Sequence, residues 1–414
     1  MRTVHFCGPK LALLSKDILK KELDMVNSLE QDIPFMGICE NGIKLDFNIG
    51  LRLRIPKGAY HVKIWDASSN IVFFDSDASD VTIISAEKFF VNWEVEIYSG
   101  NETVFYHKYD AKDKNVLFSY PISGMGDRIV LFPYMESFRV FHGCHAYYQV
   151  EDDMQELLKL YYPDTKPLDV TTRIDLYATY YLAPTFYSIF SSEEIRTLPM
   201  EYLGRELLGI EHGIKKKFLP TSSRIIEEPY VCIAVQASNT SKTWLNPYGW
   251  DMVVEYLQSI GYRVLCIDKN KEQTDHGNTV RMPIKAEDFT GAHPLSQRIN
   301  ILAYADFFIG LSSGLSWLAN AVGIPVIMIS GITAPWFEFD NPYRVINRLV
   351  CHGCHNDVKV PWPKFEYCPY RDDYTDKYEC SKRISAMQVI EKINEILQEN
   401  ENLLNYHIWG THEQ

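Results

Sequence analysis

Four of the nine cysteines gather near the carboxyl end of the chain, and the first two are separated by only two residues. This set is Cys351, Cys354, Cys368 and Cys380. In a reducing compartment such a cluster is expected to bind a metal rather than to form two disulfides. Four thiolates enclose one tetrahedral ion and leave no open position, so we expect a structural site, and the residue types alone favour zinc. His352 and His355 interleave with the first pair and are weaker candidate ligands.

A glycine-rich turn, Gly124-x-Gly126-Asp127-Arg128, separates an apolar stretch from a helical one. The amino end of a helix offers free N–H groups, and the glycines allow a ligand to approach them. A carboxylate at this place can take a proton from an attacking hydroxyl, which makes Asp127 a candidate general base. Aspartate also caps helices, so a purely structural role for Asp127 stays open at this point.

Two later segments contain side chains suited to binding phosphate. Lys242 lies in a polar loop after an apolar stretch, where its ammonium group can neutralise a diphosphate leaving group. Ser312, Ser313 and Gly314 precede a short helix, and hydroxyls at a helix amino terminus cradle phosphate without a metal. A solvated lysine and a common Ser-Gly turn are the alternatives, so this interpretation depends on the motifs occurring together.

The elements that must position these residues alternate between strand and helix after about residue 119. Beyond a linker near 215–228, we expect apolar strands at 230–237, 262–268, 306–311 and 325–330 and helices at 247–261, 296–305, 315–323 and 385–400. Continuous apolar strands with helices between them predict a doubly wound parallel sheet, which binds ligands at the carboxyl ends of its strands. Residues 34–119 instead contain seven short strands, typical of a small barrel or sandwich with a docking or oligomerisation role.

Composition and charge exclude some functions. The 414 residues include 41 Lys plus Arg and 54 Asp plus Glu, so the formal net charge is −13. An acidic surface does not attract phosphate backbones, so we expect no nucleic-acid partner. The first residues lack the apolar core of a signal peptide, and the charge-free stretch 307–337 contains glycines and polar side chains that do not suit a membrane span. We therefore expect a cytoplasmic protein without membrane insertion.

The turn from Gly124 to Pro133, the SKTW segment around Lys242 and the segment GLSSGLSWLANAVGIPVIMISG together resemble the bacterial heptosyltransferases. Within that superfamily, the strand-rich amino-terminal region and the four-cysteine cluster look like those of the autotransporter heptosyltransferases. The resemblance implies an α/β fold of the GT-B type, with two facing Rossmann-like domains preceded by the small all-β barrel or sandwich. The implied parts are a β-rich accessory domain (1–118), a first Rossmann-like domain with Asp127 (119–222), a second with a metal finger at 351–380 (223–384), and a terminal helix and tail (385–414).

The resemblance also implies roles for single residues. Asp127 falls on the catalytic aspartate of the family, and Lys242 falls on its phosphate-contacting lysine. Further donor-binding residues implied in this way are Ser312, Ser313, Gly314, Ser238, Thr240 and Asp268. The loop departs from the usual Asp-Thr-Gly-Leu-Ser-His of the lipopolysaccharide branch, because this chain has Ser312 and Trp317 at its two ends. The family further implies iron in place of zinc at the four cysteines and a large homo-oligomer, suggested to be a dodecamer.

The sequence therefore predicts a protein O-glycosyltransferase. It would move heptose from ADP-heptose to serine residues of an autotransporter adhesin passenger in one inverting displacement, with no metal required for the transfer. The alternatives are a lipopolysaccharide-type heptosyltransferase with a sugar acceptor, a non-catalytic assembly protein on a degenerate transferase fold, and a rubredoxin-like electron carrier. Turnover of ADP-heptose with the purified passenger separates the first function from all the others.

Overall fold

The structure is a computed structural model, and it describes residues 2–30, 34–121, 124–168, 174–182, 189–275, 277–360, 368–369 and 377–400. The chain divides into two compact units, and each is described here by itself. Unit 1 comprises Met1–Ser123, Val130–Ile195 and Tyr202–Lys215; unit 2 comprises Gly124–Ile129, Arg196–Glu201 and Lys216–Gln414. The last division falls inside the linker predicted near 215–228. Within the described ranges, no helix is both long and apolar enough to cross a membrane.

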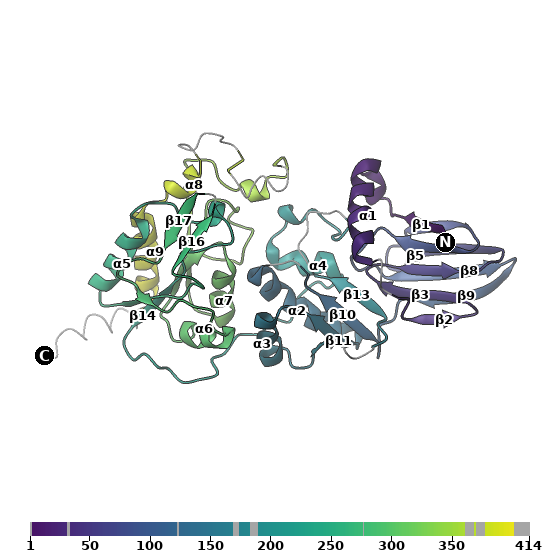
Figure 1. Ribbon diagram of the computed structural model, residues 1–414, viewed down its shortest axis with the longest axis horizontal. Coiled ribbons are helices and arrows are strands. Elements are labelled where there is room, and N and C mark those ends of the chain that lie inside the picture. Colours follow the sequence, from purple (N-terminus) through teal and green to yellow (C-terminus); the bar gives the residue numbers. More distant parts are fainter. Residues whose placement is uncertain are drawn as a thin grey trace. The chain divides into compact units, whose positions relative to one another are not determined.

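Unit 1 is built on a nine-stranded sheet with the order β1-β7-β4-β3-β13-β10-β11-β12, and β2 pairs with β3 (Figure 1). Its strands are β1 (Arg2–Phe6), β2 (Ile38–Glu40), β3 (Ile43–Asn48), β4 (Arg52–Ile55), β7 (Val81–Ser85), β10 (Asn115–Ser119), β11 (His145–Gln149), β12 (Lys166–Pro167) and β13 (Ala178–Tyr181). A second, antiparallel sheet has the order β6-β5-β8-β9. Its strands are β5 (Tyr60–Asp66), β6 (Val72–Ala78), β8 (Trp93–Ser99) and β9 (Glu102–Lys108).

The separate barrel or sandwich predicted from the sequence for residues 34–119 is not confirmed. Their strands divide between the two sheets, and β3 pairs in parallel with β13, with Asn48 opposite Thr179. The Thr179 hydroxyl donates to the Asn48 side chain at 2.7 Å, across 131 residues of sequence. The pairing provides hydrogen-bond partners for backbone groups of β3 that would have remained unpaired at the edge of a separate domain. The boundary predicted at residue 118 therefore lies within β10 of the nine-stranded sheet. The division into four parts stays a prediction.

Unit 1 also contains the helices α1 (Lys16–Glu30), α3 (Asp152–Tyr161) and α4 (Leu203–Leu208), most of α2 (Met125–His142) and the 3-10 turn η1 (Leu11–Leu13). The 3-10 turns η2 (Ile195–Thr197) and η3 (Met200–Tyr202) fall at the places where the chain passes between the two units. The helix expected after the glycine-rich turn is thus confirmed as α2. The first residues of α2 belong to unit 2, whereas the rest of that helix belongs to unit 1.

Unit 2 contains the doubly wound parallel sheet predicted from the sequence. Its strands run in the order β18-β15-β14-β19-β20-β21, and every pair along this order is parallel. They are β14 (Tyr230–Ile233), β15 (Arg263–Cys266), β18 (Glu287–Asp288), β19 (Phe308–Leu311), β20 (Val326–Ile329) and β21 (Arg344–Val345), with a separate hairpin of β16 (Glu272–Asp275) and β17 (Asn278–Arg281). The order reverses between β14 and β19, which is the place where open sheets of this kind bind ligands.

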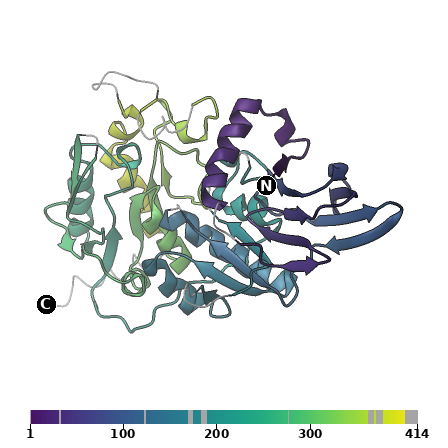
Figure 2. The ribbon, with the colours of Figure 1, turned by 45° about the vertical axis from the view of Figure 1, so that its right-hand side comes forward.

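The helices of unit 2 are α5 (Gly249–Ser259), α6 (Leu295–Leu302), α7 (Gly314–Val322), α8 (Glu379–Lys382) and α9 (Ala386–Glu399), with 3-10 turns η4 (Thr240–Lys242) and η5 (Cys354–Asn356). α5 and α9 pack side by side on one face of the sheet (Figure 1, Figure 2). Their buried residues, such as Val253 and Ile393, join those of β14, β15 and β19 in one apolar core. α9 begins with a capping box, in which Ser385 and Gln388 each satisfy a backbone N–H of the other.

Candidate functional site

Two of the predicted phosphate-binding segments lie at the point where the strand order of unit 2 reverses. Lys242 ends the turn η4 in the loop after β14, and Ser312 and Ser313 form the loop between β19 and α7. β14 and β19 are neighbours in the sheet, so the two loops leave it side by side. The geometry therefore brings together residues that are about 70 positions apart, as the parallel-sheet prediction required.

The glycine-rich turn is the third element of this site, because its residues pack directly against the start of α7. A Cβ atom added to Gly126 would lie 2.6 Å from Cδ1 of Trp317, and one added to Gly314 would lie 2.7 Å from Cβ of Met125. Larger side chains at either glycine would push the two segments apart. The amino ends of α2 and α7 are thus adjacent, and both present N–H groups that helices leave without partners.

Asp127 is the third residue of α2 and has two roles available to it. Its Oδ2 accepts a hydrogen bond of 2.7 Å from the backbone N–H of Gly124, which is the capping interaction considered as an alternative. Burial raises the pKa of Asp127 above its ordinary value, and the positive charge of Lys242 partly opposes that rise. A carboxylate with a raised pKa beside a cation is suited to accepting a proton, and capping occupies one of its two oxygens. Capping and proton transfer are therefore compatible at Asp127.

Lys242 and Ser313 keep their functional groups available to a ligand. Lys242 is half-buried, and within the described part of the chain it forms no ion pair. Ser313 is the residue before α7, yet its hydroxyl does not cap the helix. The exposed Ser238 stands in the same loop as Lys242. These three side chains and the start of α7 are the parts of the predicted donor site that the fold leaves accessible.

Three other predicted donor contacts use their polar atoms inside the protein. Asp268 is buried and accepts hydrogen bonds from the N–H groups of Val235, at 2.7 Å, and Gln236, at 3.2 Å. Burial raises the pKa of Asp268 to about 6, although these N–H groups favour its charged form. The geometry of Asp268 therefore favours bracing the strand end over touching a nucleotide.

Thr240 and Ser312 are held in the same way. The Thr240 hydroxyl donates to the Asp275 carboxylate at 2.8 Å, and the Thr240 N–H donates to it at 2.7 Å. Ser312 donates its hydroxyl to Glu338. Sequence reasoning missed Asp275 and Glu338; the only available signal was that Glu338 is the first charged residue after the charge-free stretch.

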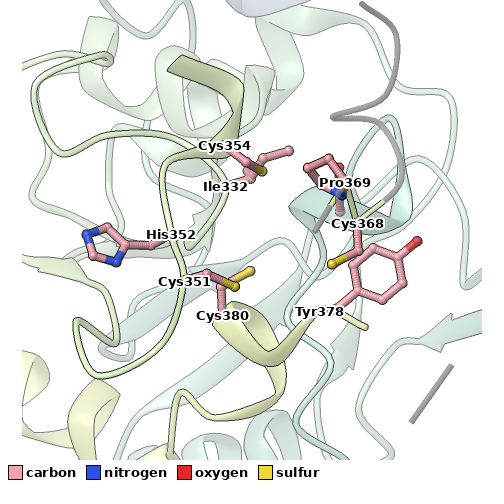
Figure 3. Close-up of a pocket in the computed structure, with 9 residues that line it drawn as sticks. Ile332, Cys351, His352, Cys354, Cys368, Pro369, Tyr378 and Cys380 are labelled. Carbon is pink, nitrogen blue, oxygen red and sulfur yellow. The ribbon is translucent and has the colours of Figure 1, made fainter. Parts of the chain in front are cut away.

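The four predicted metal ligands line a single cavity. Figure 3 shows Cys351, Cys354, Cys368 and Cys380 around it, with Ile332 and Tyr378. Burial, followed by the charges of the neighbouring cysteines, raises the pKa of Cys354 and of Cys380 to about 12. Thiols in such surroundings become thiolates when a cation compensates their charge, so this donor set fits a thiophilic metal.

The metal finger itself stays a prediction. In the described parts of the chain, no three His, Cys, Asp or Glu side chains are grouped closely enough to hold an ion. Residues 361–367 and 370–376 of the predicted finger lie outside the described residues. The His355 ring packs against Phe337, with 4.7 Å between the ring centres, and His352 donates to the carbonyl of Val350 at 2.9 Å.

Comparison with known proteins decides the family. Residues 40–101 match the model of the TibC glycosyltransferase amino-terminal domain, and residues 198–359 match glycosyltransferase family 9, the heptosyltransferases. The autotransporter heptosyltransferase Aah of Escherichia coli is 38% identical over 360 residues, which cover 85% of this chain and 92% of that protein. The chain belongs to the autotransporter heptosyltransferase family. The family and the glycosyltransferase class predicted from the sequence are thereby confirmed.

Solved and curated members of the family extend this result. One similar structure is the crystal structure of TibC from enterotoxigenic E. coli, which is described as an iron-containing dodecameric glycosyltransferase. Its TM-score is 0.84 and its sequence identity is 34%, and the match covers 89% of this chain and 98% of that chain. A second TibC structure, in complex with ADP-D-beta-D-heptose, has a TM-score of 0.83. The BimC protein of Burkholderia thailandensis is 30% identical over 374 residues, 88% of each chain, and is described as an inactive autotransporter heptosyltransferase. Membership of the family is therefore compatible with active and with inactive proteins.

Proposed function

We propose that this chain transfers heptose from ADP-heptose to serine hydroxyls of an autotransporter adhesin passenger. One observation carries the proposal: Asp127, Lys242 and the Ser313–Gly314 start of α7 converge at the reversal point of the parallel sheet. The TibC complex with ADP-heptose supports the choice of donor, and the names of the relatives support an autotransporter as acceptor. The GT-B arrangement and the cytoplasmic location predicted from the sequence belong to the same proposal.

The transfer is a single displacement that inverts the anomeric carbon. The serine oxygen forms a bond to that carbon while the bond from carbon to the β-phosphate oxygen of ADP breaks, and ADP leaves with the electron pair. The serine proton passes to Asp127, whose Oδ2 stays bonded to the N–H of Gly124. Lys242 and the free N–H groups at the start of α7 stabilise the negative charge that grows on the diphosphate.

Intact-mass spectrometry of a purified passenger fragment tests this function. Incubation with the chain and ADP-heptose should add mass in steps of one heptose, and replacing the modified serines by alanine should remove those steps. Modification of a lipopolysaccharide core sugar with an unchanged passenger would favour the sugar-acceptor alternative. No turnover with either acceptor would place the chain with BimC as a non-catalytic member, which is the second candidate that a relative at 30% identity specifically supports.

We also propose that Cys351, Cys354, Cys368 and Cys380 hold one structural iron ion and that the chain forms a homo-oligomer. The shared cavity of the four thiols and the iron-containing, dodecameric TibC support both statements. The ion would supply a cross-link within the loop and no step of the transfer. Elemental analysis of freshly purified protein separates iron from zinc. Colour separates them as well, because four thiolates give iron a visible colour that zinc, with its filled d shell, cannot show.

A further inference from the structure

A buried polar cluster lies behind the loop that precedes α7, and the transfer mechanism does not use it. Its members come from three neighbouring strands: Ser312 follows β19, Ser330 follows β20, and Arg344 of β21 lies opposite Met328, near the carboxyl end of β20. Thr333 and Glu338 belong to the connection between β20 and β21. All five side chains are buried, with Glu338 only 1% and Arg344 only 6% exposed.

Glu338 is the centre of this cluster. Its Oε1 accepts hydrogen bonds from the hydroxyls of Ser312 and Thr333, the latter at 2.7 Å. Its Oε2 accepts from Nη1 of Arg344 at 2.6 Å. Arg344 also donates through Nη2 to the hydroxyl oxygen of Thr333 at 2.7 Å, and the hydroxyls of Ser330 and Thr333 are 2.9 Å apart. The carboxylate is therefore charge-compensated and hydrogen-bonded through both of its oxygens, which stabilises a buried charge.

Ser312 is the member of this cluster that reaches the candidate donor site. The next residue, Ser313, is bonded through its N–H to Leu311 at 2.7 Å and starts α7 with an uncommitted hydroxyl. In the described part of the chain, the N–H groups of Gly314 and Leu315 have no acceptor. The hydrogen bond from Ser312 to Glu338 thus fixes the residue directly before the groups that would face a diphosphate.

We propose that Glu338, held by Arg344 and Thr333, is a positioning residue that acts through Ser312 on the donor-phosphate loop. The inference rests on the proposed function, because it takes the ligand of this loop to be a nucleoside diphosphate. It also assigns the Ser312 hydroxyl to the protein interior, which leaves Ser313 and the start of α7 to contact phosphate. Arg344 has a second consequence: without it, a buried negative charge would remain behind a loop that must accept another anion.

Ser312→Ala and Ser330→Ala form a matched pair for the test. Both remove one buried hydroxyl from the same cluster, but only Ser312 is attached to the donor loop. Calorimetric titration with ADP should show binding about tenfold weaker for Ser312→Ala, the effect of one hydrogen bond to a charged group, and less than twofold weaker for Ser330→Ala. The donor KM should rise in the same proportion, whereas kcat should change less, because Asp127 is untouched. Equal ADP affinity in the two variants would overturn the positioning role.

Variants that change the charge of the cluster provide a second test. Their pattern of ADP affinities would not be expected if Glu338 and Arg344 served only in packing. Arg344→Met should weaken ADP binding more than Glu338→Gln, because it leaves the carboxylate uncompensated. The double variant Arg344→Met with Glu338→Gln should bind ADP more tightly than Arg344→Met alone; an affinity that stays the same or falls further would contradict the electrostatic part. Wild-type protein that binds no ADP would contradict the proposed function itself, a result distinct from equal binding by the two serine variants.

Discussion

The donor-side loops of unit 2, residues 238–243 and 312–313, and the cysteine loop, residues 351–380, hold their functional side chains by different means. Each donor-side loop follows a buried parallel strand and is held by a carboxylate, which is half-buried in the first loop and buried in the second. Asp275 binds Thr240 in the first loop, and Glu338 binds Ser312 in the second. Backbone and side-chain hydrogen bonds thus place these groups before any ligand arrives.

The described part of the cysteine loop is held by hydrogen bonds from neighbouring segments, including one of 2.7 Å from Nη1 of Arg196 to the carbonyl of Val360. The N–H of Gly353 donates to Gly331 at 2.8 Å, and after the last cysteine the Ser381 hydroxyl accepts from the N–H of Leu245 at 2.8 Å. Between these points, η5 and the start of α8 are the regular elements among the described residues. The comparison teaches that strand ends can position functional groups before a ligand binds, whereas for the cysteine loop we propose that a cross-link among its own side chains completes the structure.

The largest expected effect is at the pre-positioned site. Asp127→Asn is nearly isosteric, but an amide cannot accept the serine proton, so transfer should fall about 10²–10⁴-fold. ADP binding and the melting temperature should stay close to wild type. Initial rates of heptose incorporation measure the loss; retention of more than about a third of the activity would leave Asp127 as a helix cap only.

Lys242→Ala should weaken donor binding and slow transfer together, because diphosphate charge is present in the ground state and grows in the transition state. We expect a loss of about 10²-fold in kcat/KM for the donor. Lys242→Arg is the matched control and should recover part of the loss by keeping the charge. Kinetics in which neither kcat nor KM moves would return Lys242 to the status of a solvated loop lysine.

Cys354→Ser tests the other side of the comparison. Metal content should fall from about one ion per chain towards zero, and light scattering should become smaller or more heterogeneous, because the loop cannot bury enough apolar area without the cross-link. Cys39→Ser, at an exposed cysteine outside the loop, should change neither quantity. Native wild-type protein without metal, with all four thiols open to alkylation, would remove the basis of this prediction.

The smallest expected effect concerns pH and the coupling of Lys242 to Asp127. The proposed role of Asp127 as a base requires the deprotonated carboxylate, so the transfer rate should fall as the pH falls through its raised pKa. Lys242 lowers that pKa, so Lys242→Ala should move the acid limb of the kcat profile to higher pH. Lys242→Arg should leave the acid limb of the kcat profile near its wild-type pH. An acid limb at the same pH in all three proteins would show that Lys242 does not influence the pKa of Asp127.

Sequence reasoning succeeded where local pattern was sufficient. Apolar strands alternating with amphipathic helices predicted the sheet of unit 2, and the end of each strand placed Lys242 and Ser313 at its carboxyl edge. The separate domain predicted at residues 34–119 is not confirmed, because period-two alternation identifies strands but does not identify the strands that pair with them. The neighbour of β3 is β13, and a pairing across 131 residues leaves no trace in either segment alone.

The sequence by itself determined the chemical groups of this protein and the order of the elements that carry them, since both follow from residue types and short-range periodicity. Only the tertiary structure decided which of those groups remain free for a ligand. Ser312 and Ser313 are adjacent and chemically identical, yet one donates to a carboxylate 26 positions away and the other keeps its hydroxyl uncommitted. The physical reason is that a buried charge must be satisfied by whatever donors the fold brings to it, and those donors come from distant parts of the chain.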